Sequence, residues 1–140
     1  MEFIGVIPKD LAIGALWPQI SAQIERSFKY GLNEHSLDDL RSDIEHERAF
    51  ALGVVHDLVV KFVVVATLII YPQKRVLFVQ YGAGRGGSRA KEALISAAKI
   101  LRADWIETRC RASVARLYQR IGFDTAFQVA ILEIPHVDSN

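Results

Sequence analysis

The chain has 140 residues, a length that fits one folded domain and excludes two cores of ordinary size. Hydrophobic residues make up 51% of it and charged residues 24%, which excludes a disordered chain and a disulfide-rich scaffold. The formal net charge is only +1, but residues 1–73 carry 6 basic and 10 acidic side chains, residues 74–120 carry 11 and 3, and residues 121–140 carry 0 and 3. The basic middle segment predicts an anionic partner.

Cysteine, histidine and hydropathy patterns disfavour several kinds of site. The single cysteine, Cys110, cannot form an internal disulfide, which favours a reducing, cytoplasmic location. Glu2 stands where a secretory signal carries positive charge. The longest apolar run, Leu58 to Tyr71, is too short to span a bilayer as a helix, so no membrane partner is expected. The four histidines lack the spacing of metal ligands, and no metal is expected either.

The first third of the chain predicts a strand followed by two helices. Residues 2–7 predict the strand, and residues 18–30 predict a helix with a proline in its first turn and a glycine just past its end. Ser36 and Asp39 have the spacing of a capping box. They indicate the start of a second helix, whose apolar face extends to Arg48.

The middle of the chain predicts three consecutive strands. Residues 49–55 and 59–71 are rich in Val, Ile, Leu and Phe, and His56 with Asp57 forms a polar break that suits a tight hairpin between them. After a second turn, residues 75–81 predict another strand. Three neighbouring strands joined by short turns indicate an antiparallel meander.

The last part alternates helices and strands. Residues 82–88 are glycine-rich, and residues 90–101 carry apolar side chains with the i, i+3, i+4, i+7 spacing of a helix. Residues 104–109 predict a strand, residues 113–121 a helix, and residues 127–134 a last strand. The predicted order is therefore β-α-α-β-β-β-α-β-α-β. Both tryptophans are expected in the core.

The glycine-rich stretch is a candidate anion-binding site. Four of the seven residues 82–88 are glycine, so few side chains obstruct the backbone N–H groups where a strand turns into a helix. The positive end of the helix dipole lies at the same place, and Arg85, Arg89 and Lys91 would add charge. A flexible connection without a ligand stays open as the alternative, because a lone glycine loop is weak evidence.

A second motif, Leu117-Tyr118-Gln-Arg-Ile121-Gly122-Phe123, makes the pattern recognisable. Together with the strand, glycine loop and helix before it, this motif resembles the GNAT superfamily of N-acetyltransferases. The resemblance extends over nearly the whole chain in element order, and over residues 81–94 and 111–123 in motif. It implies one α/β (α+β) domain over residues 1–140, with a mixed, mostly antiparallel central sheet and helices on both faces.

The resemblance also implies a function and a site. Acetyl-CoA would enter between two splayed parallel strands, and its acetyl group would be moved to the amine of a small molecule or a protein. Tyr118 maps onto the tyrosine that protonates the departing CoA thiolate. The implied cofactor contacts are Tyr81, Gly84, Arg85, Gly86, Gly87, Ser88 and Arg89.

The sequence departs from the family pattern at several places. Arg85 and Arg89 stand where bulky or apolar residues are usual, and the strand before the loop lacks a carboxylate that serves as general base. Glu107, His56 and Asp57 are weaker substitutes for that base. Either arginine filling the cleft would favour a binding protein over an enzyme.

Other functions therefore stay open beside acetyl transfer. One alternative is a catalytically inactive GNAT-like structural or binding protein, such as a phage virion component. Nucleic-acid contact through the basic segment is a weaker one, because no aromatic residues are interleaved with the basic ones. A homo-oligomer or larger assembly is a further expectation, since an open sheet edge is a template for pairing.

Overall fold

The structure, a computed structural model, describes residues 1–30, 34–84, 87–109, 118–120, 122–124 and 129–135. The chain divides into two compact units, Met1–Thr108 and Arg109–Asn140. The first unit holds the sheet and its covering helices, which are described next. The second is described by itself.

The first unit contains five strands, four α-helices and a short 3₁₀ helix within its described residues. In chain order they are β1 (Glu2–Val6), α1 (Lys9–Ile13), α2 (Trp17–Ser27), η1 (Phe28–Tyr30), α3 (Leu37–Glu45), β2 (Phe50–His56), β3 (Val59–Ile70), β4 (Arg75–Gly84), α4 (Gly87–Ile100) and β5 (Trp105–Thr108).

The five strands form one sheet in the order β1-β2-β3-β4-β5. The pairs β1–β2, β2–β3 and β3–β4 are antiparallel, and only β4–β5 is parallel. Helix α4 makes the crossover that a parallel pair needs. The expected mixed, mostly antiparallel sheet and its central meander are confirmed.

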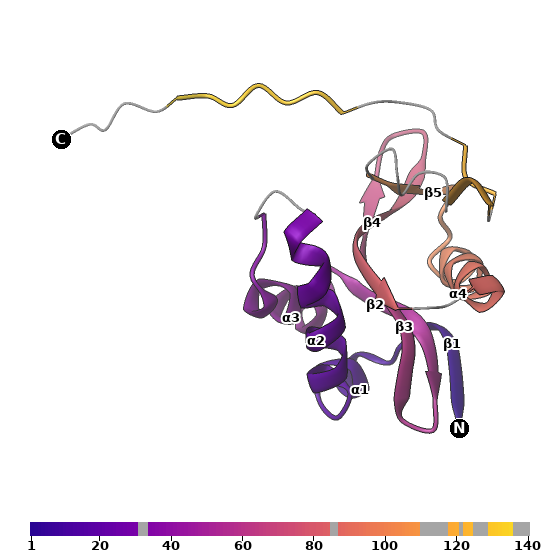
Figure 1. Ribbon diagram of the computed structural model, residues 1–140. Helices are drawn as coiled ribbons and strands as arrows, with labels where there is room; N and C mark the ends of the chain where they lie inside the picture. The colour runs from indigo at the N-terminus through magenta and orange to yellow at the C-terminus, as the bar shows by residue number, and fades with distance from the viewer. Residues whose placement is uncertain (31–33, 85–86, 110–117, 121, 125–128, 136–140) are drawn as a thin grey trace. The chain divides into compact units, whose positions relative to one another are not determined.

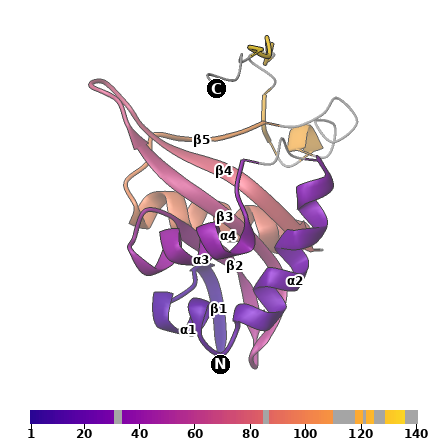
Figure 2. The same cartoon turned by 90° about the vertical axis from the view of Figure 1, so that its left-hand side faces the viewer.

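Helices cover both faces of the sheet, as expected. Helices α1, α2 and α3 lie on one face and α4 on the other (Figure 1), and the view turned by 90° shows α1–α3 in front of the strands (Figure 2). The strands serve both layers because successive side chains point to opposite faces. Ala51, Val55 and Val63 pack with the α1–α3 layer, whereas the alternate residues Leu52 and Val64 are buried toward α4.

The β2–β3 hairpin turns through Asp57 and Leu58. Both residues have positive φ angles, +48° and +62°, as the two central residues of a type I′ turn do. The Asp57 carboxylate also accepts a hydrogen bond from the Met1 amino group at 2.8 Å. The hairpin predicted at this polar break is confirmed.

Helix α3 begins at the predicted capping box. Ser36 Oγ accepts a hydrogen bond from the Asp39 N–H at 3.1 Å, and the Asp39 carboxylate accepts one from the Ser36 N–H at 2.8 Å. The bond from the Ser36 backbone, followed by the contact with its side chain, lowers the pKa of Asp39. The reciprocal bonds satisfy N–H groups that a helix start leaves without partners.

We expect Ser36→Ala to lower the free energy of unfolding by about 1 kcal/mol, because the Asp39 N–H loses its acceptor. Urea unfolding monitored by circular dichroism measures the loss. Ser21→Ala, inside α2, is the control, since alanine suits a helix interior and we expect less than about 0.5 kcal/mol there. Equal losses would show that the cap does not contribute.

The prediction for the first unit needs two corrections. Helix α1, five residues after Pro8, was not expected, because five residues are too few to show a helical period. Helix α3 ends at Glu45, so its apolar face does not extend to Arg48. Arg48 instead donates from Nε to the Asp43 carboxylate at 2.9 Å, beyond the end of the helix.

The second unit lacks the predicted last strand in its described part. Residues 129–135 have no regular secondary structure, and their side chains at Val129, Ile131, Leu132 and Ile134 are exposed. Alternating apolar residues favour a strand, but a strand also needs a partner for its backbone groups. Of the helix expected over residues 113–121, residues 118–120 are helical, and the others fall outside the described residues.

No helix in the described part of the chain is long and apolar enough to cross a membrane.

Candidate functional site

Strand β4 loses one of its two partners partway along its length. Its first part, Val76–Val79, pairs in parallel with Trp105–Thr108 of β5. At Gln80 the register with β3 shifts by one residue, which is a β-bulge. Beyond the bulge β4 stays paired with β3 up to Gly84, but within the described residues it has no partner on the β5 side. Within the described residues, strand pairing on the β5 side of β4 therefore ends at Val79.

The second part of β4 is followed closely by helix α4. Only residues 85 and 86 separate Gly84 at the end of the strand from Gly87 at the start of the helix. The first N–H groups of this 14-residue helix have no partners within the helix, and the dipole gives that end a partial positive charge. This arrangement favours an anion. Gly84 and the helix start are thus adjacent, whereas Arg85 and Gly86 lie outside the described residues.

Gln80, the residue at the bulge, has a polar atom without a partner. Its Oε1 is buried and accepts no hydrogen bond from the described residues. A buried acceptor left unsatisfied costs about 1–3 kcal/mol, and such atoms often mark a place where a ligand donates. Sequence reasoning missed Gln80, because a lone glutamine in a strand gives no signal of a bulge.

Tyr81, the first residue after the bulge, points into the core on the α1–α3 face. Its side chain is 8% exposed and belongs to the apolar cluster that includes Val63 and Val65. Its hydroxyl lies 2.9 Å from Nδ1 of His35, in the segment just before α3. The rings of Phe28 and His35 both meet it edge-on, at 5.0 and 5.6 Å between centroids. The structure thus brings His35 to a predicted site residue, although nothing in the sequence near His35 indicated it.

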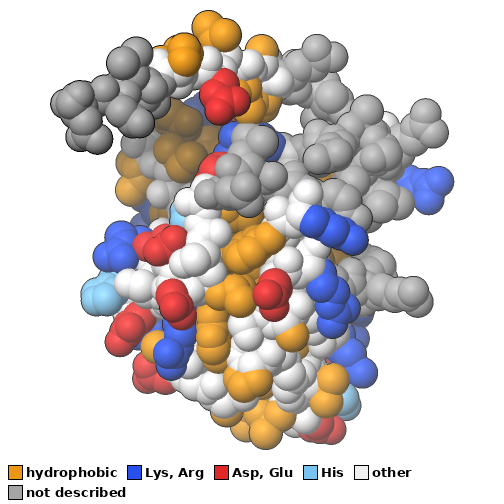
Figure 3. Space-filling view, turned by 60° about the vertical axis from the view of Figure 1, so that its left-hand side comes forward, with side chains coloured by type: hydrophobic (Ala, Val, Ile, Leu, Met, Phe, Trp, Pro, Cys, Tyr) orange, Lys and Arg blue, Asp and Glu red, His pale blue; other side chains and the backbone are white. Residues whose placement is uncertain are grey.

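The face of the first unit that carries α1–α3 is partly apolar. Figure 3 shows hydrophobic side chains gathered in a band between charged ones on this side of the molecule. Partly buried apolar residues extend the core cluster outward from the helices, namely Leu11, Ile13, Trp17, Phe28 and Leu37. Phe28, at the end of α2, is the one that contacts Tyr81 through its ring.

Arg89, in the first turn of α4, is held by two carboxylates. Its guanidinium donates to Glu2 at 2.8 Å and lies 3.4 Å from Glu92. The hydrogen bond from Arg89 lowers the pKa of Glu2, and the same bond raises the pKa of Arg89. His56 is a further neighbour of Glu2, with Nδ1 at 3.4 Å from its carboxylate. These contacts direct the Arg89 side chain toward Glu2 of β1.

The three substitutes considered for a general base are all exposed. Glu107 accepts a hydrogen bond from Nε1 of Trp105 at 3.1 Å. His56 and Asp57 lie at the hairpin end, 3.3 Å from each other, and Asp57 also binds the N-terminus. His56 and Asp57 thus lie with Glu2 and the N-terminus at the hairpin end, whereas Glu107 lies opposite Phe78 of β4.

Tyr118 lies in the second unit, in the short helical stretch 118–120. Its ring packs edge-on against Phe123, with the centroids 5.1 Å apart, and the side chain is partly exposed. Both residues belong to the Leu-Tyr-x-x-Ile-Gly-Phe motif, so the motif's two aromatic rings fix each other. The phenol is oriented by this contact within its own unit.

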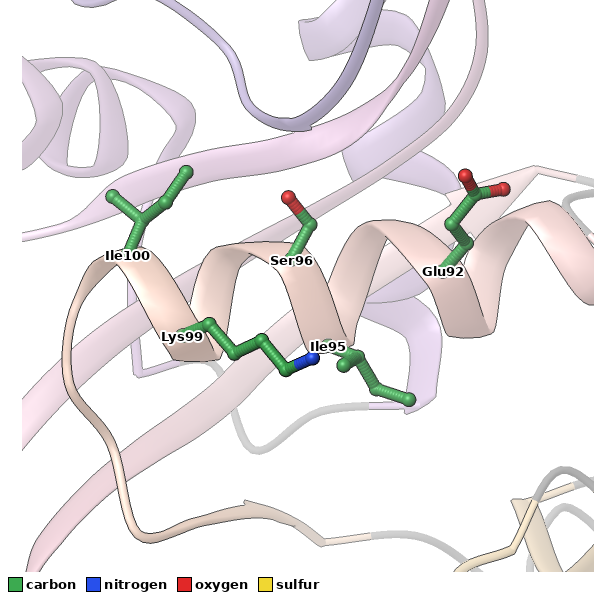
Figure 4. A pocket seen from close by; sticks show the side chains of 5 residues that line it. All are labelled: Glu92, Ile95, Ser96, Lys99 and Ile100. Carbon is green, nitrogen blue, oxygen red and sulfur yellow. The ribbon is translucent and has the colours of Figure 1, made fainter.

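A shallow hollow on the outside of α4 is distinct from this site. Figure 4 shows its lining residues on one helix, with their side chains pointing to different sides of the helix axis rather than toward one centre. They are Glu92, Ile95, Ser96, Lys99 and Ile100. A surface open along one helix offers few convergent polar groups. In the part of the chain that the structure describes, no three His, Cys, Asp or Glu side chains gather to hold a metal ion.

The fold matches that of the GNAT N-acetyltransferases among solved structures. A probable acetyltransferase is 14% identical over 99% of this chain and 99% of its own, with a TM-score of 0.66. A ribosomal-protein-alanine N-acetyltransferase from Brucella melitensis biovar Abortus 2308 is 15% identical over 96% of this chain and 100% of its own, with a TM-score of 0.65. The GNAT fold expected from the two motifs is confirmed.

An aminoglycoside N-acetyltransferase solved in complex with CoA shares the fold as well. It is 13% identical over 96% of this chain and 95% of its own, with a TM-score of 0.68. No protein-family model matches the sequence, and a search of curated proteins found no match. At these identities the likeness defines the fold, and function has to be argued from the site.

Proposed function

We propose that this protein is an N-acyltransferase that moves the acetyl group of acetyl-CoA to an amine. The observation that supports the proposal is that, within the described residues, the pairing of β4 with β5 ends at Val79, and that only two residues separate the end of β4 from the start of α4. The resulting edge and helix start suit a long ligand with an anionic end. The pantetheine arm would lie along β4, and the pyrophosphate would lie at the start of α4.

Two features of the described residues fit such a ligand. The Gln80 Oε1, buried without a partner, is an acceptor for an N–H donor, and pantetheine carries two amides. Arg89 turns toward Glu2 and Glu92, which leaves the loop amides as the main anion contacts in our proposal. When bound, acetyl-CoA supplies an activated acyl group. The chain's own residues position the amine and move the protons.

Calorimetric titration with acetyl-CoA tests the proposal. We expect binding with a dissociation constant between about 1 μM and 1 mM, the range in which enzymes hold their substrates. No measurable binding at millimolar concentration would overturn the proposal and leave the inactive binding protein as the better explanation. Free CoA is a second ligand in the same experiment, because it keeps the pyrophosphate and pantetheine but lacks the acetyl group.

An added negative charge tests whether the pyrophosphate lies at the start of α4. We expect Ser88→Asp to weaken acetyl-CoA binding by about tenfold or more, since it places a negative charge in the first turn of α4. Ile95→Asp changes the net charge equally but lies two turns further along the same helix, and we expect less than a twofold change there. Equal effects of the two variants would place the anion elsewhere.

The amine acceptor is a separate question. The structural neighbours with this fold include enzymes named for the alanine of a ribosomal protein and for an aminoglycoside, so a first panel contains an alanine-initiated peptide and an aminoglycoside. The net charge of −4 over residues 1–73, which include the helices on the Tyr81 face, favours a cationic acceptor over an anionic one.

A further inference from the structure

We propose that His35 is the general base of this acetyl transfer and that Tyr81 is the residue that positions its imidazole. This inference rests on the proposed function and assigns a proton acceptor within it. It replaces the three exposed substitutes Glu107, His56 and Asp57. The inference starts from the 2.9 Å contact between His35 Nδ1 and the Tyr81 hydroxyl.

The imidazole of His35 is held by more than this hydrogen bond. The rings of His35 and Tyr81 are nearly perpendicular, at 88°, and Phe28 meets Tyr81 at 69°. Tyr81 is buried in the core, so its hydroxyl is a fixed point. His35 is only partly buried. An anchored but accessible imidazole meets the two requirements of a catalytic base, which are fixed geometry and contact with a substrate.

The pair lies beside the part of β4 along which the pantetheine arm is proposed to lie. Tyr81 follows the bulge at Gln80 directly, and within the described residues this part of β4 has no partner on the β5 side. Its side chain points to the face covered by α2, which packs against β3 and β4. His35, which is partly buried and contacts the Tyr81 hydroxyl, lies on this same face.

The hydrogen bond also suits a base chemically. When Nδ1–H of His35 donates to the Tyr81 oxygen, Nε2 carries the lone pair and can accept a proton. In the transfer, the amine nitrogen forms a bond with the thioester carbonyl carbon, and the carbon–sulfur bond breaks. The amine gives one proton to Nε2 of His35, and the CoA thiolate takes one from Tyr118. The products are an amide and CoA thiol. His35 then releases its proton to solvent and Tyr118 takes one up, so atoms and charges balance and the enzyme returns to its starting state.

The test uses the full-length protein, acetyl-CoA and ethanolamine, a probe amine small enough to enter an acceptor site of any shape. We expect His35→Gln to lower kcat by about 100-fold, because glutamine keeps a hydrogen bond to Tyr81 but cannot take the proton. Acetyl-CoA affinity by calorimetry and the urea midpoint should not change. We expect Tyr81→Phe to lower kcat less, by about fivefold to tenfold, because the base remains but its orientation loosens.

Chemical rescue separates a base from a structural residue. We expect added imidazole to restore part of the activity of His35→Ala, as an external base does, and to leave Tyr81→Phe unchanged. Wild-type kcat in His35→Gln, or no rescue of His35→Ala, overturns the inference. So does a wild-type protein that binds acetyl-CoA but does not accelerate acetylation of ethanolamine. If the wild-type protein does not bind acetyl-CoA, the proposed function itself is overturned. The binding measurement therefore distinguishes a failure of the proposed function from a failure of the His35 inference.

Discussion

Replacing Gly53 with alanine is expected to lower the free energy of unfolding by about 3 kcal/mol or more. Gly53 lies in the middle of β2, opposite Gly5 of β1 and Val63 of β3. A Cβ atom there would lie 2.1 Å from the Phe62 carbonyl oxygen and 3.2 Å from the Val63 Cα. Both are backbone atoms of the neighbouring strand, so the two central strands would have to separate.

Gly82→Ala is the matched control for this prediction. Gly82 also lies within a strand, but the nearest atom to its added Cβ is the Val64 Cγ1 methyl group, at 2.8 Å. A side chain can rotate where a backbone cannot, so we expect a loss of about 1 kcal/mol. Urea unfolding measures both variants, and the m-value checks that each still unfolds in one step. Similar losses would show that the β2–β3 pairing is not the tight contact that the structure indicates.

Three of the elements in the middle of the chain were predictable because their signals are local. Helix α4 was predicted from the spacing of its apolar residues, and α3 from the Ser36–Asp39 capping box. The structure contains both hydrogen bonds of that box. The β2–β3 hairpin follows from a polar pair between two apolar runs. Each signal lies within a few residues, and each agrees with the global fold.

The corrections concern features that depend on distant partners. Trp105 was expected in the core, yet it is 46% exposed, because it lies on an edge strand and donates to Glu107. The last strand was expected over residues 127–134, and the described residues 129–135 form none. Propensity marks which residues suit a strand, but pairing and burial depend on what lies opposite.

The only part of the candidate site that was predictable is the part within the glycine-rich motif of residues 82–88. The adjacency of Gly84 and the start of α4 follows from the glycine loop, whereas the roles of its residues stay proposals. Neither the bulge at Gln80 nor the contact of His35 with Tyr81 has a sequence signal, since 46 residues separate the two side chains. The contact of Arg89 with Glu2 was not predictable for the same reason. Its partner Glu2 lies 87 positions away, at the start of β1.

We expect Tyr118→Phe to lower kcat for acetyl transfer by about 100-fold while leaving acetyl-CoA affinity unchanged. Phenylalanine keeps the edge-on packing against Phe123, so the local structure should persist. It lacks the hydroxyl proton that we assign to the departing thiolate. Tyr71→Phe, at an exposed position beside the β3–β4 turn, is the matched control and should leave kcat unchanged.

A change of the leaving group in the acyl donor tests whether Tyr118 acts as a general acid. An aryl thioester releases a thiolate of low basicity, which departs without being protonated. If Tyr118 supplies the proton, the ratio of wild-type to Tyr118→Phe rates should fall from about 100 toward 1 when an acetyl aryl thioester replaces acetyl-CoA as donor. A ratio that stays near 100 with both donors would assign Tyr118 to positioning instead. The His35→Gln loss should persist with either donor, because the amine must lose its proton in both reactions.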